Sequence, residues 1–286
     1  MYSRPIQIPR RADAPGSTPA RERHSARPAP VVPRIVRFDH AAIADQFPAE
    51  VVLRIDVNGC LAGAVRALPD APRELGVGWA LMHGFIAATD ALEHVTAGEG
   101  RVSIMADGGG DPDRLRLEAV GWRDPEETAG TGVVPIASDP LALTEAALTD
   151  LVERTFRAFA GDGGAAGYSH AAVAAPGAVQ CIARDLRPDL AVAKVLGWAL
   201  LDGRDLDTRI LVVRGIPDEA IVRAAARAGV ALVVSDAIPT AGAVRFAARA
   251  TCSLAGMATS DRIGLFVDAG HVTDGPEAGA ASASGA

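Results

Sequence analysis

Aromatic residues, cysteines and long hydrophobic runs are all scarce in this chain of 286 residues. Aromatic residues make up only 4% of the sequence, so a hydrophobic core must be built from Ala, Val and Leu. No apolar run approaches the ~20 residues that are needed to cross a bilayer. The N-terminus has no apolar signal region, and the polar residues after Arg10-Arg11 fit a twin-arginine signal poorly. We therefore expect a cytoplasmic protein with no membrane contact.

The three cysteines, Cys60, Cys181 and Cys252, lie far apart in the sequence. They form no C-x-x-C pair and no zinc-ligand spacing, so no metal site is expected. An odd and sparse set of cysteines is typical of a reducing compartment. The net charge of −7 argues against general affinity for nucleic acid, which needs a basic face.

Apolar residues make up 49% of the sequence, and in its second half they fall into alternating helical and strand-like segments. The predicted order is a helix from Pro188, a strand over 209–213, a helix from Pro217, a strand over 230–234, a helix from Pro239-Thr240, and strands over 252–257 and 263–267. This alternation predicts a largely parallel sheet with helices packed on it. Any site should then lie at strand ends and helix N-termini, which favour anions.

The first half predicts a smaller mixed region. Asn58-Gly59 between two β-rich segments is a strong hairpin signal, because both positions tolerate positive φ. The other elements expected here are a helix over 74–88, strands over 101–105 and 115–120 joined by a turn at 108–110, a helix from Asp139-Pro140 to about residue 160, and a hairpin over 170–175 and 178–183. The segment Gly130-Thr131-Gly132 lies in a long loop and is a weak dinucleotide signal without a preceding parallel strand.

Composition shifts divide the chain into four parts. Residues 1–33 are rich in Pro, Arg, Ala and Ser and predict a disordered tail, with a basic docking arm as the alternative. Residues 34–160 form the predicted N-terminal β/α region, and residues 161–270 form the predicted α/β/α domain. Residues 271–286, which are mostly Ala, Gly and Ser after His271, predict a second disordered tail.

The ordered set of short segments in this chain resembles the FdhD family, the accessory sulfurtransferases of formate dehydrogenases. The segments that carry the resemblance are Asn58-Gly59, 67–69, 78–86, 169–172, 191–200, 228–230 and Pro239-Thr240. Among them, residues 78–86 (GWALMHGFI) and 191–200 (AVAKVLGWAL) are similar to two helices of the family, and 169–172 (SHAA) is similar to one of its strands.

The resemblance implies a mixed N-terminal region followed by a three-layer α/β/α domain like that of cytidine deaminases, in a homodimer. It also implies that sulfur is accepted from a cysteine desulfurase as a persulfide on a C-G-x-C loop. The sulfur then passes to the molybdenum bis-molybdopterin guanine dinucleotide cofactor of formate dehydrogenase. Such a relay needs a thiol, because the thiolate is both nucleophile and sulfur carrier.

The chain departs from the family at the positions that carry this chemistry. Thr131 and Val134 stand where the loop cysteines are expected, and neither can carry a persulfide. The family's segments "G-R-H-N" and "S-G-R" correspond here to 187–190 and 214–216, and only a glycine of the second is kept. The cofactor-contacting segment corresponds to Met257 through Arg262, where the planar guanidinium of Arg262 suits a phosphate.

Several polar residues remain as candidates for a site. His170 is either a hydrogen-bonded structural residue or a catalyst, and Arg262 is either a solvated charge or an anion contact. By resemblance, Met257, Arg262, His170 and Gly132 are expected near the cofactor. Cys60 is the one cysteine that could replace the loop thiols, although a small strand residue is the simpler interpretation. Most lysines on a helix such as that of Lys194 are solvated.

The sequence therefore predicts an FdhD-like accessory protein of formate dehydrogenase maturation whose sulfur-transfer chemistry is impaired or lost. The alternative is a non-catalytic module that binds a pterin or guanine nucleotide, or that pairs with a cysteine-bearing family member. A zinc-dependent deaminase is excluded, because the sequence has no H-x-E or P-C-x-x-C pattern to hold zinc.

Overall fold

The computed structural model describes residues 49–107, 141–162, 167–204, 206 and 209–273. The strand expected over 115–120, the loop that contains Thr131, Gly132 and Val134, and the N-terminal tail lie outside the described residues. The division predicted between residues 160 and 161 stays a prediction.

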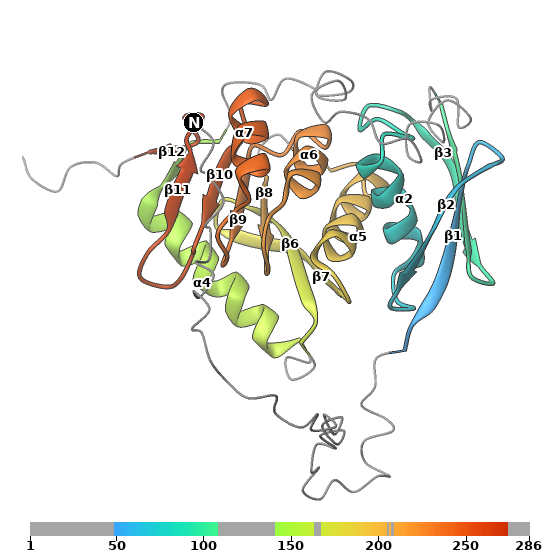
Figure 1. The fold of residues 1–286 in the computed structure, drawn as a ribbon, viewed down its shortest axis with the longest axis horizontal. Helices are drawn as coiled ribbons and strands as arrows, with labels where there is room; N and C mark the ends of the chain where they lie inside the picture. Colours follow the sequence, from blue (N-terminus) through green and yellow to red (C-terminus); the bar gives the residue numbers. More distant parts are fainter. Residues whose placement is uncertain (1–48, 108–140, 163–166, 205, 207–208, 274–286) are drawn as a thin grey trace, which may run out of the picture. The chain divides into compact units, whose positions relative to one another are not determined.

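A four-stranded sheet with the order β2-β1-β4-β3 forms the first part of the fold (Figure 1). Its strands are β1 (Val51–Val57), β2 (Cys60–Ala67), β3 (Leu92–Gly98) and β4 (Arg101–Ala106). The predicted hairpin is confirmed: Asn58 and Gly59 have φ angles of 49° and 82°, and β1 and β2 pair antiparallel. β4 pairs with β1 in parallel and with β3 antiparallel.

Two elements of this region differ from the sequence prediction. Strand β3 was not predicted, because it is mostly solvent-exposed and its sequence, LEHVTAG, lacks a regular apolar alternation. Helix α2 covers Pro72–Met82 and ends before residue 88, since Gly84 takes a left-handed conformation with φ 74°.

A six-stranded sheet with the order β11-β10-β9-β8-β6-β7 forms the second part. Its strands are β6 (Ser169–Ala175), β7 (Ala178–Asp185), β8 (Ile210–Val213), β9 (Leu232–Ser235), β10 (Ser253–Gly256) and β11 (Gly264–Val267). The strands that alternate with helices, β8, β9 and β10, pair in parallel as predicted, and the hairpin β6–β7 is confirmed. The six-stranded sheet as a whole is mixed, because β11 and β6 run antiparallel to β10 and β8. A two-residue turn joins β6 to β7, which pair antiparallel, and the loop 257–263 returns the chain so that β11 pairs antiparallel with β10.

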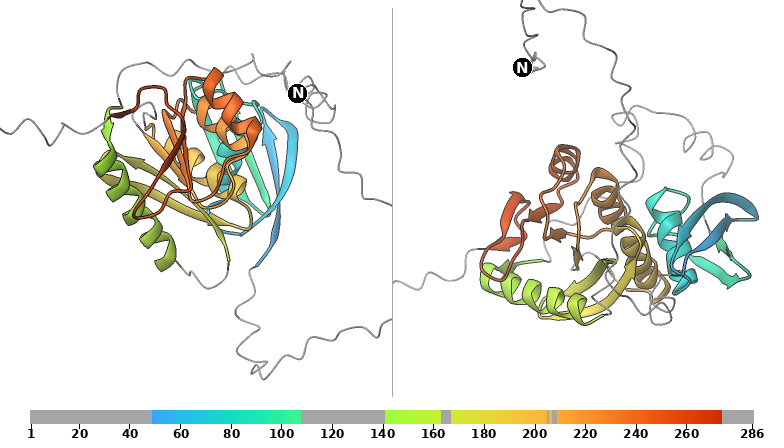
Figure 2. Two further views of the ribbon diagram at one scale, coloured as in Figure 1. Left: turned by 60° about the vertical axis from the view of Figure 1, so that its left-hand side comes forward. Right: turned by 60° about the horizontal axis from the view of Figure 1, so that its bottom comes forward.

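Helices cover both faces of this sheet, which confirms the predicted α/β class with three layers. They are α4 (Glu145–Gly161), α5 (Pro188–Leu201), α6 (Glu219–Arg227) and α7 (Ala241–Arg249). Figure 2 shows α4 on one face and α6 and α7 on the other. The likeness to cytidine deaminases stays a prediction.

Short polar side chains set the starts of three helices. Thr144, Asp218 and Thr240 each accept a hydrogen bond from the N–H three residues later. Helix α4 therefore begins at Glu145, after the strand β5 (Leu143–Thr144), and not at residues 139–140 as predicted. β5 pairs with β12 (Val272–Thr273), so the first residues of the predicted C-terminal tail belong to the fold.

Helices α2 and α5 pack backbone against backbone, which connects the two sheets. A Cβ atom on Gly78 would lie 1.7 Å from the Ala193 carbonyl oxygen, and one on Gly197 would lie 1.8 Å from the Glu74 carbonyl oxygen. Both glycines belong to segments that carry the family resemblance. The physical role of these positions is to allow the close approach of the two helices.

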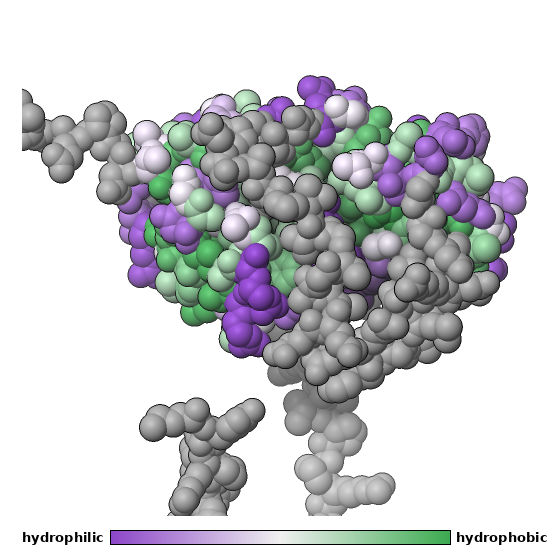
Figure 3. Space-filling model, turned by 90° about the horizontal axis from the view of Figure 1, so that it is seen from above, coloured by the Kyte–Doolittle hydropathy of each residue, from purple (hydrophilic) through white to green (hydrophobic). Residues whose placement is uncertain are grey.

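Hydrophobic and hydrophilic residues are mixed on the surface, as the green and purple areas of Figure 3 show for one face. The large hydrophobic residues that are exposed among the described ones are Val52, Met105, Ile216, Ile238, Leu265 and Phe266. Among the helices of the described part, none is long and apolar enough to span a bilayer.

Candidate functional site

The carboxyl ends of the central strands form one edge of the six-stranded sheet, which we call the carboxyl edge. β8, β9 and β10 are parallel, so all three end there. β6 runs antiparallel to β8, so its first residues lie at the same edge, where the Arg214 N–H donates to the His170 carbonyl (2.8 Å). β7 also ends there, at Asp185. The segments that meet at the carboxyl edge are 184–190, 214–218, 235–240 and 256–263.

Hydrogen bonds tie the loops of the carboxyl edge to one another. The Gly215 N–H donates to Asp236 Oδ1 at 2.8 Å, and the Ser235 hydroxyl donates to the Gly215 carbonyl. The Met257 N–H donates to the Ala237 carbonyl at 3.1 Å. The loops after β8, β9 and β10 are therefore held as one connected surface, although they are distant in sequence.

Three arginines lie at the carboxyl edge near β6, β7 and β8. The side chains of Arg184, Arg187 and Arg214 are 36%, 60% and 37% exposed. Arg184 Nη1 lies 3.3 Å from Asp162 Oδ1, and Arg214 Nε lies 3.7 Å from Asp236 Oδ2. Partly exposed guanidinium groups are strong donors to phosphate and carboxylate groups, so this edge can accept an anionic ligand.

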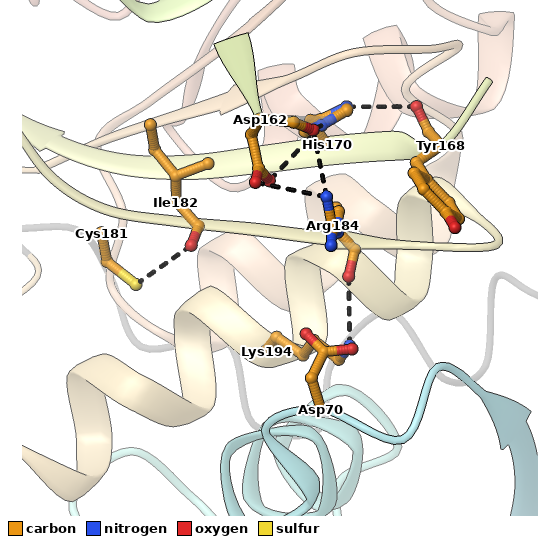
Figure 4. A network of polar contacts seen from close by, with 8 residues as sticks. All are labelled: Asp70, Asp162, Tyr168, His170, Cys181, Ile182, Arg184 and Lys194. Atoms are coloured by element: carbon orange, nitrogen blue, oxygen red, sulfur yellow. Dashed lines mark hydrogen bonds and ion pairs between the residues drawn. The ribbon is translucent and has the colours of Figure 1, made fainter. Parts of the chain in front are cut away.

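His170 lies at the carboxyl edge, but its ring is buried beneath it (Figure 4). The ring stacks on Phe159 of α4 with 5.2 Å between centroids, and its Nδ1 lies 3.1 Å from the Tyr168 carbonyl oxygen. Its Nε2 lies 3.7 Å from Asp162 Oδ2, and Arg184 Nη1 donates to the same carboxylate. The buried His170 ring therefore contacts the Asp162 carboxylate, which in turn accepts a hydrogen bond from Arg184.

Lys194 is buried and ion-paired, whereas the sequence predicted a solvated lysine. Its side chain is 1% exposed, and its Nζ lies 2.7 Å from Asp185 Oδ2 and 3.1 Å from Asp70 Oδ1. It also donates to the Arg184 carbonyl at 3.1 Å (Figure 4). Three oxygens thus surround the ammonium, which donates hydrogen bonds to two of them and forms an ion pair with the third.

Asp185 completes this buried cluster. Its side chain is fully buried at the end of β7, and its Oδ1 accepts the N–H groups of Leu68 (3.2 Å) and Leu186 (2.7 Å). The cluster joins the loop after β2 to the turn that leads into α5. It therefore holds the segment of Arg184 and Arg187 in place from the side of the four-stranded sheet.

The other predicted site residues fall into two groups. Met257 and Arg262 lie in the loop after β10, at the carboxyl edge, where Met257 has a φ of 51° and Arg262 is exposed. Gly132, Thr131 and Val134 lie outside the described residues.

The three cysteines lie away from the carboxyl edge. Cys60 begins β2 in the other sheet, and Cys181 lies within β7 opposite Val173. Cys252 is fully buried just before β10, at the opposite edge of the sheet. Burial raises the pKa of the Cys181 thiol to about 11 and that of the Cys252 thiol to about 12. Both are therefore thiols near neutral pH.

The part of the chain that the structure describes has no metal-binding group at the carboxyl edge, and the cavity beside β3 lies away from it. Within the described ranges, no set of three or more His, Cys, Asp and Glu residues is placed to hold a metal ion. A cavity of about 620 Å³ lies beside β3 and the end of α5, lined in part by Arg73, Asp90 and His94. Its lining contains none of the predicted site residues.

Sequence reasoning missed the Lys194–Asp185 pair and the role of Asp236. The sequence contained one indication of the Lys194–Asp185 pair, because Lys194 is the only lysine in a chain that otherwise uses arginine. Asp236 gave no signal, since its contact with Gly215 depends on the pairing of β8 and β9.

The fold defines an α/β protein whose arginine-lined carboxyl edge is the candidate site. Residues 48–273 match the model of the FdhD/NarQ family, and the chain belongs to that family.

Known relatives agree with this assignment. The chain is 29% identical over 281 residues to the sulfur carrier protein FdhD of Anaeromyxobacter dehalogenans, covering 86% of this chain and 95% of the relative. It is 25% identical over 233 residues to the sulfur carrier protein FdhD of Methanothermobacter thermautotrophicus, covering 76% and 87%. A crystal structure of a proposed formate dehydrogenase accessory protein from Desulfotalea psychrophila has the same fold, with a TM-score of 0.65 at 21% identity, covering 79% of this chain and 90% of that one.

Proposed function

We propose that this chain serves formate dehydrogenase maturation by binding the guanine-nucleotide form of the molybdenum cofactor as cargo, without relaying sulfur through a cysteine. The observation that carries the proposal is the separation of two features. The anion-accepting groups gather at the carboxyl edge, whereas none of the chain's three cysteines lies there.

The groups at the carboxyl edge suit a ligand that contains phosphates and flat rings. Arg214 and Arg262 can donate to a pyrophosphate with their planar forks, and Arg187, whose Nε and Nη2 donate to Asp189, adds positive charge beside them. Ile216 and Ile238, in the loops after β8 and β9, are 60% and 61% exposed and offer apolar surface to a base or pterin ring. Open α/β sheets bind such ligands at the carboxyl ends of their strands.

The test of cargo binding is calorimetric titration with GDP, which carries the pyrophosphate and guanine of the cargo. Wild-type protein binds GDP, and Arg214→Ala and Arg262→Ala each weaken binding about tenfold, as expected for a lost charged hydrogen bond. Arg66→Ala is the control, because Arg66 is exposed on β2 in the other sheet. No binding of GDP, or equal binding by all variants, overturns the proposed site.

A sulfur relay needs a thiolate that a partner can reach. The raised pKa values of Cys181 and Cys252 and the complete burial of Cys252 oppose this, and Thr131 and Val134 stand at the expected loop positions. Incubation with a cysteine desulfurase should leave all three cysteines, Cys60 included, without persulfide. Trapping of a persulfide on any of them contradicts the proposal.

A second candidate role is pairing, as a homodimer or with a cysteine-bearing relative. The observation that favours it is the edge strand β11, where Leu265 and Phe266 are 41% and 37% exposed. An exposed apolar edge strand is a template for pairing with another chain. Co-purification with a cysteine-bearing relative or with formate dehydrogenase subunits, lost on Phe266→Lys, supports this role, and a monomer that captures neither argues against it.

A further inference from the structure

Asp236 occupies the position that an incoming anion would take at the carboxyl edge. Its Oδ1 accepts the Gly215 N–H at 2.8 Å in a hydrogen bond exposed to solvent, and its Oδ2 lies 3.7 Å from Arg214 Nε. A backbone N–H and a guanidinium beside it are the donors that a phosphate oxygen pair uses in proteins. The carboxylate of Asp236 accepts the Gly215 N–H and lies within ion-pair distance of Arg214.

We propose that Asp236 is an internal competitor of the anionic ligand, so that ligand binding requires the carboxylate to leave Gly215 and Arg214. This inference rests on the proposed function, because it concerns the same carboxyl edge. It adds a determinant of specificity: a ligand must offer enough negative charge to replace a carboxylate that is already bound.

The surroundings of Gly215 keep its N–H aimed at the carboxylate. Gly215 has a φ of 122°, and a Cβ atom there would lie 2.9 Å from Pro188 Cγ at the start of α5. The Ser235 hydroxyl, which is buried, donates to the Gly215 carbonyl from the other side. Pro188 thus confines Gly215 at its Cα and Ser235 holds its carbonyl, whereas the side chain of Asp236 is 35% exposed and can swing into solvent.

Competition and loop positioning predict different changes in anion affinity when Asp236 is neutralised. If Asp236 only positioned the loop, its removal would weaken anion binding or leave it unchanged. If Asp236 competes, its neutralisation strengthens anion binding, because a like charge at the ligand's position is removed and Arg214 is released.

The experiment is calorimetric titration of the full chain with inorganic pyrophosphate at low ionic strength, where surface charges are least screened. Asp236→Asn keeps an oxygen that can accept the Gly215 N–H but removes the charge. We expect it to bind pyrophosphate about tenfold or more tightly than wild type, since juxtaposed like charges cost several kcal/mol. Adding Arg214→Ala should abolish this gain.

The matched control is Asp268→Asn. Asp268 is also exposed and also accepts a backbone N–H, from Gly270 at 2.8 Å, but it follows β11 at the opposite edge of the sheet. Asp268→Asn makes the same change in net charge as Asp236→Asn. It should alter the affinity for pyrophosphate less than twofold, roughly the effect of a distant, screened charge. Thermal unfolding of each variant confirms that it is folded.

The outcomes separate this inference from the proposed function. Pyrophosphate binding by wild type with no gain in Asp236→Asn, or with an equal gain in Asp268→Asn, overturns the competitor role and leaves the proposed site standing. Absence of pyrophosphate binding in every variant overturns both.

Discussion

Lys194 Nζ lies 2.7 Å from Asp185 Oδ2, and both side chains are removed from solvent. Asp70 and the Arg184 carbonyl supply the two other oxygens around the ammonium, each at 3.1 Å. A buried charge is tolerated only when it is paired and hydrogen-bonded, and here the ammonium donates two hydrogen bonds and is ion-paired with Asp185. The pair binds the loop after β2 to the strand end that leads to the carboxyl edge.

Replacing Lys194 should destabilise the protein strongly. Lys194→Met leaves Asp185 as an unpaired buried carboxylate, which costs about 3–5 kcal/mol in the free energy of unfolding. Lys194→Arg should also be costly, since a planar fork does not fit three oxygens arranged around one nitrogen. Urea unfolding measures the change.

The control for this prediction is an exposed ion pair on β2. Arg66 lies 3.0 Å from Glu50, and both side chains are well exposed. Arg66→Met should change the free energy of unfolding by about 1 kcal/mol or less. Equal losses for Lys194→Met and Arg66→Met would show that the buried cluster is not a structural determinant.

Gly78→Ala should disrupt the contact of α2 with α5. The added methyl group would lie 1.7 Å from the Ala193 carbonyl oxygen, so the helices must separate. Overpacking of this kind costs about 1–3 kcal/mol or more. Gly98→Ala, where a Cβ atom meets nothing within 4 Å, is the matched substitution and should be nearly neutral. Thermal unfolding compares the two, and similar midpoints would contradict the packing described for α2.

Thiol reactivity should follow burial. The pKa values of about 11 for Cys181 and about 12 for Cys252 keep both protonated at pH values near 8, where Ellman's reagent is used. We expect Cys60, at the half-buried start of β2, to react first in the native protein, and all three to react together after denaturation. Rapid reaction of native Cys252 would be inconsistent with its position before β10.

His271 should make stability depend on pH. The Ser253 hydroxyl oxygen accepts the Ala269 N–H at 3.0 Å and forms a buried hydrogen bond with His271 Nδ1, 2.9 Å away. Burial lowers the pKa of His271 below its ordinary 6.5, an effect that Asp268 partly opposes. The unfolded chain then binds a proton at His271 more readily than the folded chain. The stability that neutral His271 contributes is therefore complete above pH 6.5 and is lost as the pH falls through the lowered pKa of the folded state.

The free energy of unfolding of wild type and of His271→Gln, measured from about pH 8 to about pH 5, checks this sign. Burial and Arg227 also lower the pKa of His83, so His83 adds to the pH dependence of stability in the same direction. This effect is present in both wild type and His271→Gln. The difference between them isolates His271: wild type should lose more stability on acidification than His271→Gln. Parallel pH profiles would refute the role of His271.

Much of the fold could be predicted because its elements leave local signals. The buried strands β8, β9 and β10 are short apolar runs, and the helices between them begin at residues that cap helices. β3 left no such signal, since its side chains are mostly exposed. The antiparallel position of β6 beside β8 was not predictable, because the alternation of strands and helices favours parallel pairing.

The position of the candidate site could be predicted in part. Strand and helix alternation placed an anion site at strand ends, and the resemblance pointed to 187–190, 214–216 and 257–262, which the sheet brings to one edge. The buried position of His170 and the pairing of Lys194 with Asp70, 124 residues away, depend on tertiary contacts that no local pattern encodes.

The most direct measurement is intact-mass spectrometry of the full chain after incubation with a cysteine desulfurase and cysteine. Wild type should keep its mass, whereas Thr131→Cys/Val134→Cys, which restores both loop thiols, should gain sulfur that a reductant removes. Addition of reducible sulfur to wild-type protein at Cys60, Cys181 or Cys252 would contradict the account, because it would place a working relay outside the carboxyl edge.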